Sequence, residues 1–297
     1  MISVLIPIFN QSVVSLIREI SDQLSKLRID FEIIALDDGS DLRFHDLNAP
    51  IQDFSGVKYI LQGYNIGRAA IRNRLAEMAQ YENLIFLDCD SEIRNPAFIA
   101  TYMSYVHSDV VYGGTHYEDK KNAPETNLHA KFGKLREALP AEIRNENGWM
   151  TFKTNNFMIK KSILKALPFD VEITRYGYED VVLAEGLKEK GIKITHIDNP
   201  VTHHGLETNE RFLSKTEESL TNLVELVNQG KIRDTRLLVF YNKVRWLMHA
   251  PGMDWVVLWA TRRLRKIMIS SGGNLWQFDL WKLMVYHQKT KSLPKIR

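Results

Sequence analysis

Apolar and polar positions along the first 114 residues follow two periods, one typical of strands and one typical of helices. Short apolar runs of strand length occur at residues 3–8, 31–37, 57–62, 84–88 and 109–114. Between them, residues 12–27 and 67–80 place apolar side chains three and four positions apart, as in an amphipathic helix. A further helix is expected at 96–106. This alternation predicts a mostly parallel α/β sheet with helices on both faces.

The pattern changes after residue 114, where a long polar segment precedes a second series of strands and helices. Residues 115–148 lack a strong period and are expected to be a long loop with a short helix around Leu128 to Ala138. The later elements are expected to be a strand then a helix at 154–164, a helix at 179–190, a strand at 192–197 and a helix at 209–229. Ligands of such sheets bind beyond the carboxyl ends of the strands, so polar residues there are candidates for function.

The last 67 residues differ from the rest in charge and in aromatic content. Residues 231–297 hold 14 Lys and Arg against three Asp, a charge of +11, so residues 1–230 carry −8 of the total of +3. They also hold five of the six Trp. Two helices broken at Pro251–Gly252 are expected here, with a third at 275–287. The chain therefore predicts one domain over 1–230 and a basic, Trp-rich helical region over 231–297.

This tail suggests a partner. Basic helices rich in aromatic residues can lie on an anionic membrane surface. Packing of these helices on the rest of the chain, or a homo-oligomer, are the alternatives that stay open. Nucleic acid is not expected, because the first domain is acidic and the tail lacks a recognisable binding module.

The single cysteine, Cys89, excludes an intrachain disulfide and fits a reducing compartment. The start of the chain lacks a basic leader, and the apolar run at 255–260 is far short of the roughly 20 residues that cross a bilayer. We therefore expect a cytoplasmic protein, with peripheral contact to the inner face of the cytoplasmic membrane as an extension of that expectation.

The stretch LIFLDCDSE at 84–92 carries the first candidate chemistry. A buried strand ends in Asp88 and Asp90, which project to the same side, and a buried carboxylate is costly unless something pairs with it. The chain has neither a Gly-Lys-Ser/Thr phosphate loop nor a GxGxxG after its first strand. A nucleotide diphosphate would therefore be held through Mg²⁺ or Mn²⁺ on carboxylates. The alternative for Asp88 and Asp90 is a solvated turn.

Five segments in order resemble a GT-A glycosyltransferase of family 2. They are IPIFN at 6–10, EIIALDDGS at 32–40, NIGRAAIRN at 65–73, FLDCDSEI at 86–93 and YGYEDVVLAEGLKEKG at 176–191. The resemblance covers about residues 2–210. It implies a GT-A catalytic domain with a C-terminal helical extension, and an inverting enzyme that uses a nucleotide-diphospho-sugar, in the manner of bacterial polysaccharide synthesis.

The resemblance also implies roles for individual residues. Asp38 stands where the family binds uracil, Asp88 where it contacts the ribose, and Asp90 where it ligates the metal. Asp88 would also reach the metal through water. The nucleotide-sugar-binding residues implied are Pro7, Asn10, Asp37, Asp38, Asn65, Arg72, Asp88 and Asn156. For Arg72, an ordinary position on a helix surface is the alternative.

Glu179 and Asp180 begin a predicted helix, where acids also complement the helix dipole. The resemblance implies that Asp180 is the general base and that Glu179 helps to position the acceptor. It further implies a late histidine as a metal ligand, which His203 matches better than His204. Trp149 is a candidate for stacking on a sugar, with core packing as its equal rival.

The combined interpretation is a metal-dependent transfer of a hexose or N-acetylhexosamine from a UDP-sugar to a glycan acceptor, which a lipid could carry. A sugar-nucleotidyltransferase would need a Gly-rich basic loop where this chain has FNQSVV. A non-catalytic nucleotide- or glycan-binding module would show a broken base or metal motif, and both are present. The sequence leaves the donor sugar, the acceptor and the linkage open.

Overall fold

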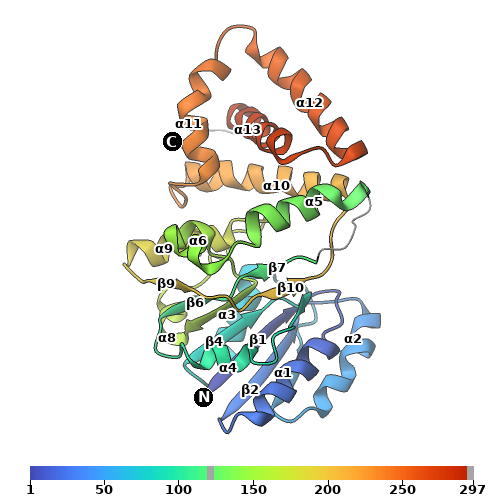
Figure 1. Ribbon diagram of the computed structural model, residues 1–297, viewed down its shortest axis with the longest axis vertical. Helices are drawn as coiled ribbons and strands as arrows, with labels where there is room; N and C mark the ends of the chain where they lie inside the picture. Colours follow the sequence, from blue (N-terminus) through green and yellow to red (C-terminus); the bar gives the residue numbers. More distant parts are fainter. Residues whose placement is uncertain (119–123, 293–297) are drawn as a thin grey trace. The chain divides into compact units, whose positions relative to one another are not determined.

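The computed structural model describes residues 1–118 and 124–292. Within them the chain forms two compact units, each with its own packing (Figure 1). We call residues 1–118, 137–174 and 179–205 the sheet unit, and residues 124–136, 175–178 and 206–292 the helical unit. Residues 206–230 thus pack with the tail that follows them. The domain boundary expected at residue 230 stays a prediction.

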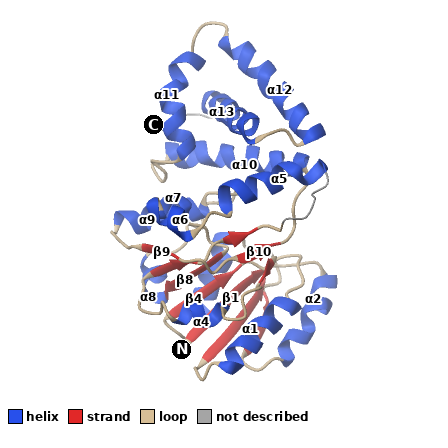
Figure 2. Ribbon diagram, viewed as in Figure 1, coloured by secondary structure: helices blue, strands red, loops and turns tan. Residues whose placement is uncertain are grey.

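The sheet unit is built on a seven-stranded sheet with the order β3-β2-β1-β4-β8-β6-β9 (Figure 2). Its strands are β1 (Ile2–Ile8), β2 (Phe31–Asp37), β3 (Val57–Leu61), β4 (Asn83–Leu87), β6 (Val110–Tyr112), β8 (Asn156–Lys160) and β9 (Ile194–His196). β1 pairs in parallel with β2 and β4, and β2 with β3. β8 runs antiparallel to both β4 and β6. The expectation of an α/β fold with a parallel-rich sheet is confirmed.

Side chains alternate between two cores on the two faces of this sheet. Val4 and Ile6 of β1 pack in one core, with Ile17 and Ile20 of α1 (Val14–Lys26). Leu5, between them in sequence, packs in the other. That second core includes side chains of α3 (Arg68–Met78), α8 (Lys161–Ala166) and α9 (Glu179–Glu189). The fully apolar strands of the sequence are therefore strands that bury both faces.

Several elements differ from the expected boundaries. The helix expected at 96–106 is shorter, α4 (Phe98–Met103). Residues 42–53, for which no element was expected, form α2 (Leu42–Asn48) and a 3-10 turn (Ala49–Asp53). A second sheet of three short strands contains β5 (Ser91–Glu92), β10 (Val201–His203) and β7 (Thr115–His116).

The polar segment 115–148 is more regular than the expected loop with one helix. After β7 it forms a 3-10 turn (Pro124–Thr126), α5 (Asn127–Phe132), a π-helical turn (Gly133–Glu137), α6 (Ala141–Glu146) and α7 (Gly148–Thr151). The helix expected around Leu128 to Ala138 corresponds to α5 and the turn that continues it. Residues 119–123 of this segment lie outside the described residues.

The helical unit contains α10 (Asn209–Asn228), α11 (Arg236–Met248), α12 (Met253–Ser271) and α13 (Leu275–Ser292). The expected break at Pro251–Gly252 is confirmed. α10 and α13 both contribute to the core of this unit, and Phe278 and Trp281 of α13 are fully buried. Across the described residues, no helix combines the length and the apolar character needed to span a bilayer.

Candidate active site

Two pairs of carboxylates lie where β2 and β4 end. Because both strands run parallel to β1, which lies between them, their carboxyl ends meet at the same edge of the sheet. Neighbouring strands are about 4.8 Å apart, so the two ends are separated by about 10 Å. Asp37 and Asp38 follow β2, and Asp88 and Asp90 follow β4. The acids that follow β2 and β4 therefore lie at the edge of the sheet where ligands of such folds bind.

The pair after β2 is held by the protein itself. Asp37 is 0% exposed, and its Oδ1 accepts a hydrogen bond from the Ser40 amide (2.7 Å). Its Oδ2 accepts one from the Tyr59 hydroxyl (3.3 Å). Burial of Tyr59, together with the adjacent Asp37 charge, raises the pKa of that phenol to about 12 and keeps it a donor. Asp37 therefore joins β2 to β3 and has no surface for a ligand.

Asp38 ties the end of β2 to the start of α3. Its two carboxylate oxygens accept hydrogen bonds from the amides of Ile66 (2.7 Å) and Gly67 (3.2 Å). Burial is the largest influence on this carboxyl and raises its pKa, while the two amide bonds oppose that rise. Each oxygen keeps a second lone pair for a ligand.

The remaining predicted residues on this side surround the same turn. Asn10, with φ of 51°, donates its amide to Ser40 Oγ (2.8 Å), and its Oδ1 accepts from the Asp41 amide (2.8 Å). Pro7 lies partly buried in β1, and Asn65 is exposed. At Gly39, φ is +77°, and an added Cβ would stand 2.7 Å from the Asn65 amide nitrogen. The Asp-Asp-Gly-Ser turn therefore needs glycine there.

The pair after β4 faces other side chains. Asp88 is about one-third exposed, and Arg72 Nη2 lies 2.8 Å from its Oδ1. Arg72 itself is buried, and its Nη1 lies 3.9 Å from Glu179 Oε1. The Nε of Arg72 is buried with no hydrogen-bond partner among the described residues. A buried guanidinium with an unused donor suits an anionic ligand.

Asp90 has a histidine partner from β10. Its Oδ2 lies 3.4 Å from Nδ1 of His203, and the Asp90 side chain is 36% exposed. Burial lowers the pKa of His203, but the hydrogen bond and the charge of Asp90 outweigh it, so the pKa is raised. His204 instead places its Nε2 2.7 Å from Glu92 Oε2. The two adjacent histidines therefore point to different acids.

Asp90 and His203 are the residues that fit a divalent cation. Within residues 1–118 and 124–292, no group of three or more His, Cys, Asp and Glu side chains is arranged to hold a metal ion. A carboxylate and an imidazole alone still fit an ion that takes its other ligands from water and phosphate oxygens. The donor set thus fits a metal that binds together with a diphosphate.

The two acids at the start of α9, Glu179 and Asp180, contact different basic residues. Glu179 is buried, with its Oε1 3.7 Å from Nη1 of Arg68 and near Arg72. Asp180 Oδ2 lies 3.0 Å from Nζ of Lys153, and its Oδ1 accepts from the Val181 amide (2.8 Å). The Asp180 charge is the largest influence that raises the pKa of Lys153, so the ammonium stays charged beside it.

Three residues near Asp90 and Asp180 were not expected from the sequence, and they are Tyr117, Glu137 and Lys153. The Tyr117 hydroxyl hydrogen-bonds to the Glu137 carboxylate, and the Tyr117 ring is 5.6 Å from that of His203. The Glu137 charge also contributes to raising the pKa of both Lys153 and His203. Glu137 therefore connects the Asp90 side of the site to the Asp180 side. Its segment shows no strong period, and nothing in the sequence marks Glu137 as a functional residue.

Two other candidates are engaged elsewhere. Asn156 is fully buried, and its Nδ2 donates to the carbonyl oxygens of Gly114 and Asn199, both at 2.9 Å. Its Oδ1 accepts from the Tyr102 hydroxyl (2.7 Å). Every polar atom of this amide is used by the protein, so we leave Asn156 out of the proposed site. Trp149 is partly exposed and donates its Nε1–H to the Ile192 carbonyl oxygen (3.3 Å).

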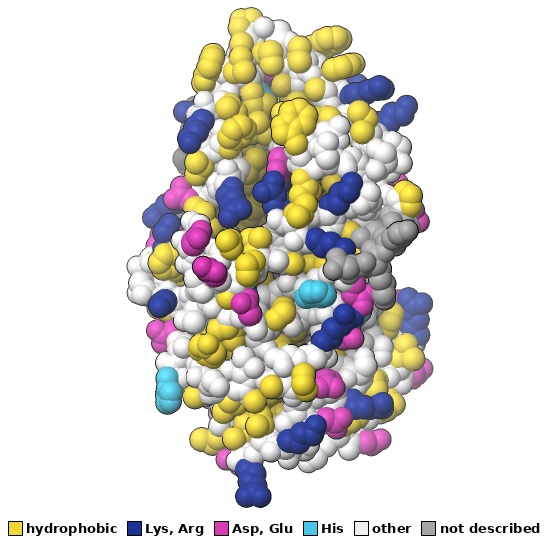
Figure 3. All heavy atoms as spheres, in the orientation of Figure 1, with side chains coloured by type: hydrophobic (Ala, Val, Ile, Leu, Met, Phe, Trp, Pro, Cys, Tyr) yellow, Lys and Arg dark blue, Asp and Glu magenta, His cyan; other side chains and the backbone are white. Residues whose placement is uncertain are grey.

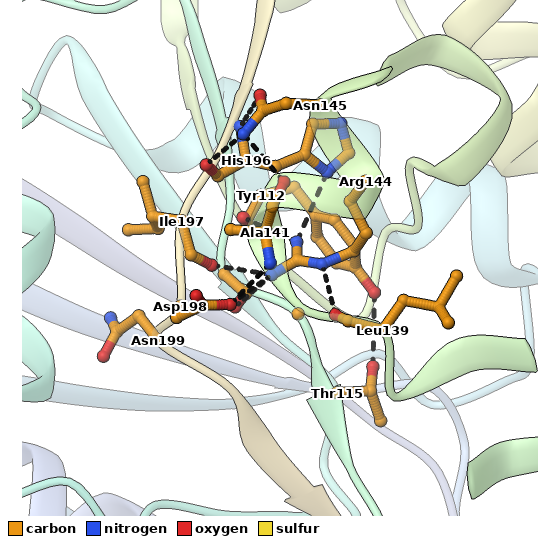
Figure 4. A network of polar contacts seen from close by, with 12 residues as sticks. Tyr112, Thr115, Leu139, Ala141, Arg144, Asn145, His196, Ile197, Asp198 and Asn199 are labelled. Atoms are coloured by element: carbon orange, nitrogen blue, oxygen red, sulfur yellow. Dashed lines mark hydrogen bonds and ion pairs between the residues drawn. The ribbon is translucent and has the colours of Figure 1, made fainter. Parts of the chain in front are cut away.

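A buried arginine fixes the segment that carries Lys153 and Glu137 to the sheet (Figure 4). Arg144 stacks on the Tyr112 ring, with its Cζ 4.9 Å from the ring centroid. It donates to the carbonyl oxygens of Leu139, Tyr112, Gly113 and Ile197. Its Nη1 also lies 3.3 Å from His196 Nδ1, whose Nε2 is 2.9 Å from the Gly148 carbonyl oxygen. Burial of the His196 ring, with the neighbouring guanidinium, lowers its pKa to about 4.

Comparison with known families and proteins identifies relatives. The sequence profile of the family described as "Glycosyl transferase family 2" matches residues 3–167. The chain is 26% identical over 238 residues to chondroitin synthase of Pasteurella multocida (strain Pm70), which covers 68% of this chain and 24% of that protein. It is 22% identical over 237 residues to chondroitin synthase of Escherichia coli, covering 68% and 34%.

A third curated relative is a smaller protein. Over 232 residues the chain is 26% identical to validoxylamine A glucosyltransferase of Streptomyces hygroscopicus subsp. jinggangensis (strain 5008), covering 66% of this chain and 53% of that protein. The chain thus spans from about a quarter to about half the length of these relatives.

Solved structures share the fold. A mannosyltransferase from Pyrobaculum calidifontis, in complex with GDP-Man and Mn²⁺, superposes with a TM-score of 0.57 at 14% identity, covering 98% of this chain and 86% of that chain. Glucosyl-3-phosphoglycerate synthase from Mycobacterium tuberculosis, in complex with Mg²⁺ and UDP, gives 0.51 at 13% identity, covering 79% and 81%. The GT-A fold expected from the sequence is confirmed.

Proposed function

Because the chain belongs to glycosyl transferase family 2 and is a glycosyltransferase, we propose that it moves a hexose or N-acetylhexosamine from a UDP-sugar to a glycan hydroxyl with inversion. The observation that carries this proposal is the cluster at the end of β4. Asp88 lies 2.8 Å from Arg72, and Asp90 lies 3.4 Å from His203. One side of this cluster offers a cation for a diphosphate, and the other offers oxygen and nitrogen ligands for a metal.

Asp90 and His203 would hold Mn²⁺ or Mg²⁺, and Asp88 would contact the ribose and reach the metal through water. The bound metal would neutralise charge on the departing diphosphate. The complexes of the Pyrobaculum mannosyltransferase with Mn²⁺ and of the mycobacterial synthase with Mg²⁺ support a divalent ion. A mixed carboxylate and imidazole pair favours Mn²⁺ over Mg²⁺, because imidazole is a softer ligand than oxygen.

Asp180 is the proposed general base. Inversion requires a carboxylate that takes the proton of the acceptor hydroxyl while its oxygen attacks C1 from the face opposite the diphosphate. Asp180 Oδ2 lies 3.0 Å from the ammonium of Lys153, a contact that a substrate hydroxyl would displace or share. Glu179 is buried against Arg68 and Arg72, so it would act by positioning them.

The donor base and the acceptor form the finer part of the proposal. Asp38 would bind uracil through the lone pairs that the Ile66 and Gly67 amides leave free. Asn10, Pro7 and Asn65 border that turn. UDP in the mycobacterial complex supports uracil, whereas GDP-Man in the Pyrobaculum complex makes GDP the competitor to test. The two chondroitin synthases support a glycan acceptor. A cytoplasmic location stays a prediction.

Calorimetry of UDP binding, with and without Mn²⁺, tests the proposal. Wild type and Asp90→Ala are compared, with Glu92→Ala as the matched control because Glu92 faces His204 instead. We expect metal-dependent UDP binding that Asp90→Ala abolishes and Glu92→Ala preserves. UDP binding that is equally strong with and without Mn²⁺ would exclude the proposed metal site. An equal loss of UDP binding in Asp90→Ala and Glu92→Ala would exclude it as well. GDP binding in preference to UDP would exclude the proposed donor.

A further inference from the structure

The hairpin of α11 and α12 exposes large apolar side chains around its turn. Trp246 at the end of α11 is 73% exposed, and Trp255 and Trp259 at the start of α12 are 71% and 57% exposed. Leu247 and Leu258 beside them are also exposed. Figure 1 shows the two helices meeting at the turn, and Figure 3 shows apolar side chains gathered on the helical unit. Such a concentration of exposed tryptophan marks an interaction surface.

This exposed face is separate from the face that holds the helical unit together. α12 buries Val257, Thr261 and Met268, and α11 buries Leu238 and Tyr241. Tyr241 also donates or accepts at His287 Nδ1 of α13, 3.0 Å away. The buried residues of α11 and α12 therefore pack the helical unit, and the exposed tryptophans take no part in that packing.

The order of residues along α12 is graded from apolar to cationic. Its exposed positions are first Trp255, Val256, Leu258 and Trp259, and then Arg262, Arg263 and Lys266. At 1.5 Å per residue, Trp255 and Arg262 are about 10 Å apart along the helix. The two residues are seven positions, or about two turns, apart, so they lie on nearly the same side of α12. On α11 exposed apolar and cationic residues alternate, with Arg236, then Val239 and Phe240, then Lys243 and Arg245, and last Trp246 and Leu247.

The charge of the hairpin selects an anionic partner. Residues 236–271 contain seven Lys and Arg and a single acid, Asp254. Asp254 is paired with Lys291 of α13, so the one negative charge near the turn is compensated within the unit. Cations that flank exposed tryptophan complement the phosphates of a negatively charged bilayer surface.

We propose that the turn between α11 and α12 docks on the surface of an anionic lipid bilayer. Trp246, Trp255 and Trp259 enter the interface, while Arg262 and Arg263 contact lipid phosphates. The hairpin lies on the membrane and does not cross it. This proposal does not rest on the proposed donor, metal or base.

Vesicle sedimentation of the full chain tests it. Wild type is mixed with vesicles of phosphatidylcholine and phosphatidylglycerol, or of phosphatidylcholine alone. The variant carries Trp246→Ser, Trp255→Ser and Trp259→Ser. The matched control is Trp276→Ser, because Trp276 is 71% exposed but lies on α13, which starts near the opposite end of α12. Thermal unfolding checks that each variant folds.

We expect binding to the anionic vesicles, weakened about tenfold or more by the triple variant and unchanged by Trp276→Ser. Arg262→Gln with Arg263→Gln weakens binding to the anionic vesicles, and added salt does the same. Absence of binding by wild type, or equal loss in Trp276→Ser, would overturn the proposal. So would a wild-type dimer that binds no vesicle and that the triple variant converts to a monomer in sedimentation velocity.

Discussion

The two carboxylate pairs at the ends of β2 and β4 look alike in sequence and differ in their surroundings. Asp37 is 0% exposed and accepts from the Ser40 amide and the Tyr59 hydroxyl, with His45 Nε2 3.6 Å from its Oδ1. Asp38 accepts from the Ile66 and Gly67 amides. Asp88 and Asp90 are 34% and 36% exposed and meet the side chains of Arg72 and His203. The first pair is bound mainly by groups that cannot move, whereas the second is bound by side chains that can rearrange around a ligand.

A pair of acids at a strand end can therefore serve either structure or chemistry. Backbone amides fill the hydrogen-bonding capacity of a carboxylate without adding a charge, so such a carboxylate can link two secondary-structure elements. A guanidinium and an imidazole bring charge and metal-binding nitrogen, so they suit a nucleotide diphosphate. Three substitutions and one pH titration test this difference.

Replacing Asp90 should give the largest loss of activity with the smallest loss of stability. Asp90→Asn removes the charge that would hold the metal, which contributes several kcal/mol to the transition state. We expect kcat/KM for sugar transfer to fall on the order of 10³-fold. The metal-free unfolding midpoint should fall only slightly, because the contact with His203 is weakened but no backbone donor loses its acceptor side chain. Glu92→Asn is the control, and a similar loss of activity there would contradict the assignment.

Acid titration should destabilise the third polar cluster, around Arg144. The pKa of His196 is lowered to about 4 in the fold, against about 6.5 in an unfolded chain. The unfolded state therefore binds more protons between pH ~6.5 and ~4, and stability rises with pH across that window. The contribution is complete above pH ~6.5 and is lost as the pH falls toward ~4. It amounts to about 3 kcal/mol.

Urea unfolding at a series of pH values measures this effect. His196→Gln keeps a donor for the Gly148 carbonyl oxygen and removes the titrating ring. The difference between wild type and His196→Gln should change across the stated window and be flat above it. A difference that is constant from pH 4 to 7 would show that His196 does not titrate anomalously.

Replacing Asp37 should mainly reduce stability, whereas replacing Asp90 should mainly reduce activity. Asp37→Ala leaves the buried Ser40 amide and the half-buried Tyr59 hydroxyl without their acceptor. We expect the free energy of unfolding to fall by about 2 kcal/mol, as for other buried donors left unpaired. Urea unfolding measures it, with Asp41→Ala at the exposed neighbouring position as the control. Full stability combined with lost UDP binding would assign Asp37 to the ligand instead.

The mildest change is Arg72→Lys, which keeps the charge and loses the fork of donors. Lysine cannot contact Asp88 while also offering the second donor that Arg72 Nε provides. We expect the Kd for UDP to rise about tenfold, or about 1.4 kcal/mol. Calorimetry measures it, and Arg74→Lys on the same helix is the control. An unchanged Kd would place Arg72 outside the nucleotide site.

Most of the fold follows from local pattern, and the exceptions have tertiary causes. The runs at β1, β2 and β4 are apolar enough to predict strands without further context. The direction of β8 does not follow from its own residues, because pairing with β4 and β6 sets it. α2 was missed because its polar sequence, LRFHDLN, buries only Asn48 and shows no apolar stripe.

The residues of the candidate site could be proposed from sequence only where two acids stand close together, and these assignments stay predictions. Asp88, Asp90 and the Glu179–Asp180 pair stand out by position after strands and before a helix. Lys153 and Glu137 are ordinary charged residues in sequence, and only the path of residues 137–153 along the sheet unit brings them near Asp180 and His203. Asn156 was expected to bind the nucleotide-sugar, but its side chain forms buried hydrogen bonds within the protein, one of them to the Gly114 carbonyl oxygen.

Cys89 stands between Asp88 and Asp90, and burial raises the pKa of its thiol to about 12, with the two flanking charges adding to the effect. The thiol is therefore neutral at physiological pH, and alkylating reagents and peroxide, which react with thiolates, attack it slowly. The single thiol of the chain therefore reacts slowly in the folded protein, and its reaction rate reports on the end of β4. Its labelling rate by iodoacetamide would follow the opening of that strand end, and a ligand that closes the site would slow the reaction further.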